Sequence, residues 1–181
     1  MTHTSIAWRG RTLRIETAWV GAAQSHHPPL VFLHEGLGSV AMWKDFPARM
    51  CEAHGLRGLV FSRYGYGRST PRPALEKWPV EFMHAQAVEV LPALFAQVQL
   101  HDPPWLFGHS DGASIALLYA AAHSERVAGV VAVAPHVFVE DVSVASIEQA
   151  RVAYAGTDLK RRLARYHDDP TQCFVALPSV A

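Results

Sequence analysis

Short apolar runs alternate with longer amphipathic stretches along this chain, and this alternation predicts strands that take turns with helices. Residues 30–33, Leu-Val-Phe-Leu, form a continuous apolar run, which is typical of a strand buried on both faces. Further runs of this kind lie at 58–61, 105–107 and 127–133. Residues 12–18 instead alternate polar and apolar positions, as a half-exposed strand does. Together with residues 6–9, they predict an N-terminal hairpin around Gly10.

Helical periodicity fills the stretches between these runs. Helices are predicted at 45–54, 80–100, 113–124, 144–154 and 159–166. Pro92 is expected to kink the second helix, because proline cannot donate an intrahelical hydrogen bond. Strands that alternate with helices predict an α/β fold, with a mostly parallel, twisted sheet and helices on both of its faces.

Length and charge exclude several classes of protein. The chain has 181 residues, of which half are hydrophobic and 18% are charged, so we expect a folded core rather than a disordered chain. Lys and Arg number 16, as do Asp and Glu, and a net charge of zero offers no general attraction for nucleic acid or acidic membranes. Residues 1–10 lack a signal-peptide pattern, and no apolar run approaches the roughly 20 residues of a membrane span. A cytoplasmic location is therefore expected.

The sequence has few residues that could form a disulfide or a metal site. The two cysteines, Cys51 and Cys173, cannot form a disulfide framework or a zinc site. The adjacent pair His26 and His27 lacks a third ligand nearby. We therefore expect no metal and no cofactor.

Ser110 lies in the pattern Gly-x-Ser-x-Gly, between a short apolar strand and an Ala-rich helix. This context is that of a nucleophile elbow, a tight turn that exposes the serine Oγ at the carboxyl edge of a sheet. The turn crowds the residues two before and two after the serine, and Gly108 and Gly112 are small enough to fit. The following helix starts with unpaired N–H groups, so the N–H of Asp111 is expected to stabilise an oxyanion.

A second apolar strand, residues 30–33, runs into the loop His34-Glu35-Gly36-Leu37-Gly38. An elbow needs a second oxyanion N–H from such a loop. Gly36 is the first candidate and Leu37 the second. His34 is interpreted as a residue that hydrogen-bonds the loop and maintains its shape, at the border of the pocket.

These pieces resemble the α/β-hydrolase superfamily, in its serine-nucleophile branch, over residues 5 to 140. The likeness rests on the His34 loop, on residues 64–69 (Tyr-Gly-Tyr-Gly-Arg-Ser) after the fourth strand, and on the elbow at Ser110. Glu35 stands where many members have glycine. Ser62 and Tyr64 stand where many have Asp and Arg. The resemblance implies a catalytic acid and histidine after late strands of the sheet, beyond a helical cap.

The residues after Ser110 show no such late strands, so we interpret the chain as C-terminally truncated. Residues 1–140 form the hydrolase core, and residues 141–181 the start of a helical cap with an irregular tail. His136 is expected to line the pocket with His109 rather than act as base. His123 and His167 are read as solvated. An open sheet edge would favour self-association.

The resemblance implies a serine hydrolase acting on an ester-like or related carbonyl bond of a small-molecule substrate. Ser110 would be the nucleophile, Asp111 and Gly36 would hold the oxyanion, and a histidine outside this chain would be the base. The alternative is a non-catalytic fragment, or a ligand-binding pseudo-hydrolase without acid and histidine.

Overall fold

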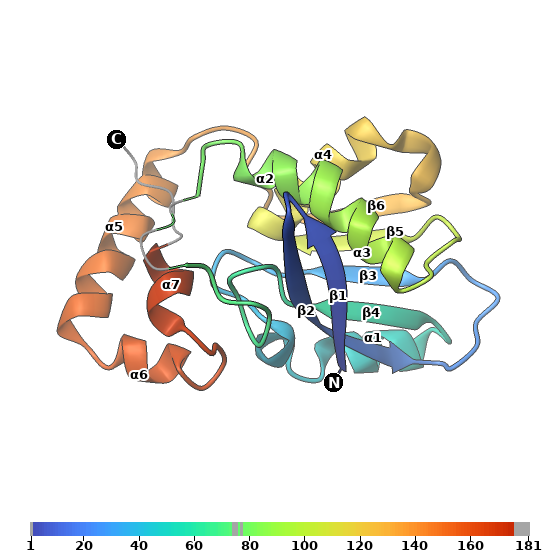
Figure 1. Ribbon diagram of the computed structural model, residues 1–181, viewed down its shortest axis with the longest axis horizontal. Coiled ribbons are helices and arrows are strands. Elements are labelled where there is room, and N and C mark those ends of the chain that lie inside the picture. The colour runs from blue at the N-terminus through green and yellow to red at the C-terminus, as the bar shows by residue number, and fades with distance from the viewer. Residues whose placement is uncertain (1, 74–75, 77, 176–181) are drawn as a thin grey trace.

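Six strands form one sheet in the order β1-β2-β4-β3-β5-β6 in a computed structural model that describes residues 2–73, 76 and 78–175 (Figure 1). The strands are β1 (Thr2–Trp8), β2 (Arg11–Gly21), β3 (Leu30–Leu33), β4 (Arg57–Phe61), β5 (Trp105–His109) and β6 (Gly129–Val133). The first two form the predicted antiparallel hairpin, and β2 is also antiparallel to β4. The remaining strand pairs are parallel. The predicted α/β fold with a mostly parallel, twisted sheet is confirmed.

The helical elements follow the predicted order with shifted bounds. They are η1 (Val40–Trp43), α1 (Phe46–Ala53), α2 (Phe82–Ala85), η2 (Gln86–Val90), α3 (Leu91–Gln97), α4 (Asp111–Ala122), η3 (Ser124–Arg126), α5 (Asp141–Gly156), α6 (Leu159–Leu163) and α7 (Pro170–Val175). The helix predicted at 80–100 is divided by η2, a π-helical turn. Pro92 lies just after this turn and cannot donate to the carbonyl four residues earlier, so the helix widens before it. A kink was expected at Pro92, and the irregularity that the structure shows is the π-helical turn at Gln86–Val90.

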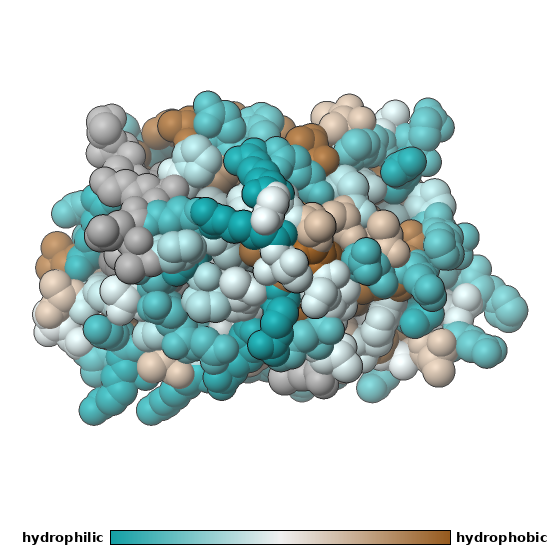
Figure 2. Space-filling model, viewed as in Figure 1, coloured by the Kyte–Doolittle hydropathy of each residue, from teal (hydrophilic) through white to brown (hydrophobic). Residues whose placement is uncertain are grey.

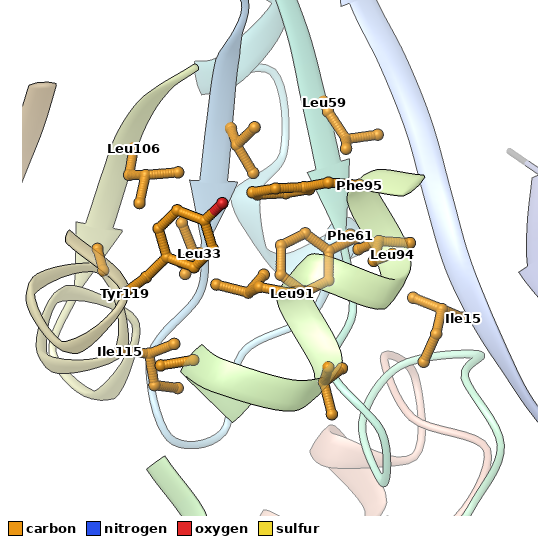
Figure 3. Packing of buried hydrophobic residues seen from close by; sticks show 14 of the residues in the cluster. Ile15, Leu33, Leu59, Phe61, Leu91, Leu94, Phe95, Leu106, Ile115 and Tyr119 are labelled. Atoms are coloured by element: carbon orange, nitrogen blue, oxygen red, sulfur yellow. The ribbon is translucent and has the colours of Figure 1, made fainter. Parts of the chain in front are cut away.

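Alternate residues of the central strands face two separate apolar layers. Leu33, Phe61 and Leu106 pack with α3 and α4 on one face, as the labelled side chains of Figure 3 show. Phe32 and Val60 pack with Cys51 of α1 on the other face. A strand that buries both faces needs apolar residues at every position. This explains the continuous runs in the sequence.

Helices α5 to α7 lie beside the carboxyl edge of the sheet rather than on either face (Figure 1). The boundary proposed at residue 140 falls between β6 and α5. The helix predicted at 159–166 ends earlier, at Leu163, and α7 was not predicted. The last residues of the apolar tail, 176–181, lie outside the described part of the chain. Figure 2 shows one face of the molecule, where polar side chains dominate and apolar residues form small separate groups.

Strand β6 forms one edge of the sheet. Over the described ranges it pairs with β5 and with no other strand. Val131 and Val133 are 38% and 41% exposed on it, and residues 137–139 (Val-Phe-Val) beyond it are more exposed still. Among the residues that the structure describes, no helix is long and apolar enough to cross a membrane.

Candidate active site

Ser110 occupies the turn between β5 and α4 in a strained backbone conformation. Its φ is 53° and its ψ is −121°. Residues other than glycine rarely adopt this conformation, because it costs them about 1–3 kcal/mol. The Ser110 N–H donates to Val133 O of β6 at 2.9 Å, and the Ser110 carbonyl accepts from the N–H of Ala113 and Ser114. These bonds hold the strained turn, which has the form of a nucleophile elbow.

The two glycines of the turn have no room for a side chain. A Cβ on Gly108 would lie 2.4 Å from Gly112 O and 2.5 Å from the Cα of Ala113. A Cβ on Gly112 would lie 2.1 Å from Leu33 O. All of these neighbours are backbone atoms, which cannot move aside cheaply. The turn therefore requires glycine at both positions, as the sequence pattern indicated.

The loop after β3 forms a β-turn opposite the elbow. The Gly38 N–H donates to Glu35 O at 3.0 Å, which makes Gly36 and Leu37 the two central residues. Central N–H groups are not used by the turn's own hydrogen bond. Asp111 is the first residue of α4, so its N–H has no partner within the helix. The sequence predicts that these N–H groups are candidate donors to an oxyanion.

His34 supports this turn from the interior. Its side chain is fully buried, its Nδ1 lies 2.7 Å from Glu35 O, and its Nε2 accepts the Arg63 N–H at 3.0 Å. Burial and the neighbouring Arg63 hold the pKa of His34 well below its usual range, so the ring is neutral and donates from Nδ1. His34 thus hydrogen-bonds the loop, as expected, but it lies beneath the turn and does not line an open pocket.

Arg63 is a buried cation that sequence reasoning missed. Its side chain is 2% exposed, and its Nη2 donates to Glu35 O at 2.8 Å. The same nitrogen lies 3.6 Å from Oδ2 of Asp111, and the guanidinium lies over the Tyr66 ring. Arg63 therefore connects the turn after β3 to the first residue of α4. Its signal in the sequence was an arginine two residues after the end of a buried strand.

Glu16 is a second buried charge that the sequence did not reveal. Its Oε2 accepts the Ser62 hydroxyl at 2.6 Å and the Arg68 N–H at 2.9 Å. Ser62 stands where many α/β-hydrolases have an aspartate, and here a carboxylate reaches that place from β2. Glu16 falls on the polar phase of an alternating strand, so the pattern predicted a solvated residue.

His136 provides the hydrogen-bond partner of the candidate nucleophile. Its Nε2 lies 2.7 Å from Ser110 Oγ. Ser114 fixes the backbone of residue 136 through its hydroxyl, which accepts the His136 N–H at 2.8 Å and donates to its carbonyl at 3.0 Å. His136 lines the apolar groove, as expected, and its hydrogen bond to Ser110 Oγ was not anticipated. Strand β6 lies directly beside β5, so the loop that follows it reaches the elbow.

The acidic partner of His136 is not a triad acid in its geometry. Asp111 Oδ1 lies 3.9 Å from Nε2, the same nitrogen that meets the serine. Across residues 2–73, 76 and 78–175, no carboxylate is hydrogen-bonded or ion-paired to Nδ1 of His136. The imidazole is 39% exposed. The arrangement is therefore a Ser–His pair with an anion nearby, without an orienting acid.

The remaining histidines are placed differently from one another. His109 is partly exposed, and its Nδ1 lies 3.6 Å from Glu35 Oε2, across the mouth of the site. His123 is partly buried rather than fully solvated, because its ring packs on Tyr119 and its Nε2 is buried. His167 is also not on the surface. Its side chain is buried between the cap segment and the core, because the segment after α6 folds back onto two core loops.

A groove of about 550 Å³ opens beside His136 and Ser114, lined mainly by apolar side chains of α2 and α4 such as Met83, Leu117 and Leu118. The described side chains include no group of three or more His, Cys, Asp or Glu that could hold a metal ion.

Comparisons with known proteins identify the family and the fold. The sequence model of the alpha/beta hydrolase fold family matches residues 28–169. A proline iminopeptidase of Arabidopsis thaliana is 31% identical over 117 residues, which are 62% of this chain and 28% of that protein. The chain therefore spans less than a third of that relative's length.

Solved structures show the same fold. A thermophilic esterase of Thermogutta terrifontis superposes with a TM-score of 0.69 and 17% identity, over 97% of this chain and 70% of the esterase. A carboxylesterase structure from Nitrososphaera gargenis gives 0.68 and 18%, over 89% of this chain and 56% of that one. At these identities the likeness concerns the fold alone.

Proposed function

Because this chain belongs to the alpha/beta hydrolase fold family, we propose that it is a serine hydrolase that cleaves ester-like carbonyl bonds through Ser110. One observation carries the proposal: the Ser110 Oγ, on a strained turn at the carboxyl edge of the sheet, lies 2.7 Å from an imidazole nitrogen. A serine hydroxyl is a weak nucleophile until a base accepts its proton. His136 is that base in this proposal, in place of a histidine outside the chain.

The reaction follows from the positions of these groups. Ser110 Oγ attacks the substrate carbonyl while His136 Nε2 accepts its proton. The carbonyl oxygen becomes an oxyanion, which the N–H groups of Asp111 and Gly36 stabilise. The imidazolium then returns the proton to the departing alkoxide, leaving an acyl group on Ser110. Attack by water, with His136 again accepting the proton, releases the acid and restores the serine.

The lack of an orienting carboxylate among the described side chains lowers the expected rate. In a serine triad, replacing the acid lowers kcat by roughly 10⁴. Here the carboxylate of Asp111 stabilises the imidazolium from 3.9 Å but does not hold the ring from Nδ1. We infer slow hydrolysis of activated esters by this chain. The apolar groove beside His136 favours an apolar acyl group of modest length.

The relatives' names fit this reaction class. Esterases and an iminopeptidase are both hydrolases of carbonyl bonds. The second candidate function is a ligand-binding pseudo-hydrolase, and one observation favours it: His136 has no carboxylate at Nδ1 among the described side chains.

The deciding experiment measures hydrolysis of p-nitrophenyl butyrate by the purified chain. We expect saturable turnover that disappears in Ser110→Ala. The control is His27→Ala, because His27 is exposed in a loop remote in sequence from the elbow, and its turnover should match the wild type. Turnover that persists in Ser110→Ala contradicts the proposal. Absence of turnover in the wild type supports the pseudo-hydrolase.

A further inference from the structure

His167 joins the cap segment to two core loops that flank the site. It follows α6 and lies more than 90 residues from either loop in sequence. Its Nδ1 accepts the Gly67 N–H at 2.9 Å, and its Nε2 lies 2.9 Å from Leu37 O. The side chain is 2% exposed. A solvated histidine was expected here, so its burial needs an explanation of its own.

The two bonds define one protonation state of the ring. Because Nδ1 accepts a hydrogen bond from a backbone N–H, the proton resides on Nε2, which donates to Leu37 O. The neutral ring thus uses both nitrogens at once. A protonated ring would place a second N–H against the Gly67 N–H and lose that bond. The ring also meets Tyr66 edge-on, at 6.3 Å between centroids.

The turn that carries the oxyanion candidates is therefore held from two sides. From the core, His34 and Arg63 both bond to Glu35 O, at the first position of the turn. From the cap, His167 bonds to Leu37 O, at the third position. The N–H groups of Gly36 and Leu37 lie between these two anchors, so their direction depends on both.

We propose that His167 is a positioning residue for the oxyanion turn: docking of the cap segment through His167 sets the direction of the Gly36 and Leu37 N–H groups. The inference deepens the proposed function and rests on it for its kinetic consequence. Its structural half, the ordering of residues 35–38 by the cap, stands on the hydrogen bonds alone.

Neighbouring contacts support docking at this point. The Asp168 N–H donates to Gly67 O at 2.9 Å, and the Asp168 carboxylate pairs with the Arg68 guanidinium. That ion pair is about half exposed, so it is worth little. The charged groups that face His167 are Glu16, Glu35 and Arg68, with the neutral ring of His34 beyond. The buried imidazole, which has a hydrogen bond at each of its two nitrogens, is thus the main polar contact between the cap segment and the core.

Three substitutions separate the two bonds. His167→Ala removes both. His167→Gln places an amide nitrogen near the Nε2 position and retains the donor to Leu37 O. His167→Asn places an oxygen near the Nδ1 position and retains the acceptor for the Gly67 N–H. Asp168→Asn is the matched control, since it removes the adjacent exposed ion pair and leaves His167 unchanged.

Amide hydrogen exchange on the full chain reads the structural half. We expect His167→Ala to speed exchange at least about 10-fold in peptides covering residues 35–40 and 65–69. His167→Gln restores slow exchange in residues 35–40 only, and His167→Asn in residues 65–69 only. Asp168→Asn leaves both unchanged. Equal exchange in His167→Ala and Asp168→Asn overturns the proposal, and so does equal rescue of both segments by Gln and Asn.

Steady-state kinetics reads the other half. A misdirected oxyanion donor lowers kcat by roughly 10- to 100-fold, so we expect that loss in His167→Ala, with KM within about 3-fold of wild type and kcat largely restored in His167→Gln. If His167 had a purely structural role, kcat would change equally in the Gln and Asn variants. That result would contradict the positioning role. Absence of turnover in the wild type defeats the proposed function, whereas the exchange pattern still decides whether His167 orders the turn.

Discussion

The two halves of the candidate site are built in contrasting ways. The half that holds the proposed nucleophile and oxyanion donors, called here the oxyanion half, rests on buried groups: Gly108 and Gly112 leave no space, and Arg63 and His34 converge on one carbonyl oxygen. The half that holds the proposed base rests on His136, which is 39% exposed and follows the edge strand β6. The first half is fixed by packing, whereas the second is fixed by the hydrogen bonds of Ser110 and Ser114.

Because of this difference, substitutions in the two halves should affect stability and activity differently. A change in the buried half alters the backbone and therefore stability and activity together. A change at His136 should alter the proposed proton transfer with little effect on the fold. Four measurements test whether the two halves differ in this way.

Replacing Gly112 by alanine should have the largest effect. The new Cβ would lie 2.1 Å from Leu33 O and 2.5 Å from Leu33 C, both backbone atoms. We expect a loss of about 3 kcal/mol or more in the free energy of unfolding, with no measurable turnover. Urea unfolding checks it. The control is Gly156→Ala, at a helical position with open space around it, which should be neutral. Equal stability of the two variants would show that the elbow is not rigid.

Replacing His136 by alanine should separate activity from stability. Loss of a general base costs roughly 10²–10⁴ in rate, so we expect turnover of p-nitrophenyl butyrate to fall by that factor. The free energy of unfolding should change by less than about 1 kcal/mol, because the side chain is partly exposed. A variant with wild-type turnover would remove His136 from the mechanism.

Acid should weaken the oxyanion half through its two buried histidines. Burial, chiefly, lowers the pKa of both His34 and His167 in the folded chain. In the unfolded chain they titrate near 6.5. Below that pH the unfolded state binds more protons, so stability falls as pH falls, by up to about 1.4 kcal/mol per pH unit for each histidine. It stops falling below the lowered folded-state pKa values.

Urea unfolding at pH 7.5 and pH 5.5 measures this slope, and His167→Gln should reduce it. A slope that is the same in the variant and in the wild type would show that His167 does not contribute.

The smallest effect on stability is expected at the edge strand next to His136. Self-association through the exposed edge of β6 should be visible as concentration-dependent sedimentation. Val133→Lys should reduce it and change the free energy of unfolding by less than about 0.5 kcal/mol. Val152→Lys, on α5 with an equally apolar, exposed side chain, is the control. A wild type that sediments as a monomer at every concentration argues against edge pairing.

Local features of the fold could be predicted from the sequence, whereas contacts between distant segments could not. The apolar run of β3 and the glycines around Ser110 are local signals, since period, side-chain size and turn geometry act over a few residues. The central strands and the turn at Ser110 were therefore predicted with nearly correct bounds, whereas the first strand, expected at residues 6–9, spans Thr2–Trp8.

The long-range contacts were not predicted. Glu16, Arg63 and His167 are polar residues that become buried only when segments far apart in sequence meet, and a polar residue alone indicates solvent exposure. The contact between His136 and Ser110 was also not predicted, because it depends on the adjacency of β5 and β6. Strand order in space, which no local pattern encodes, decides that contact.

The central claim is that Ser110 is an activated nucleophile. The most direct measurement is intact-protein mass spectrometry after exposure to a serine-directed fluorophosphonate, followed by peptide mapping. We predict one adduct per chain, located on Ser110 and absent from Ser110→Ala. A chain that remains unmodified, or an adduct at any other residue, would contradict this account.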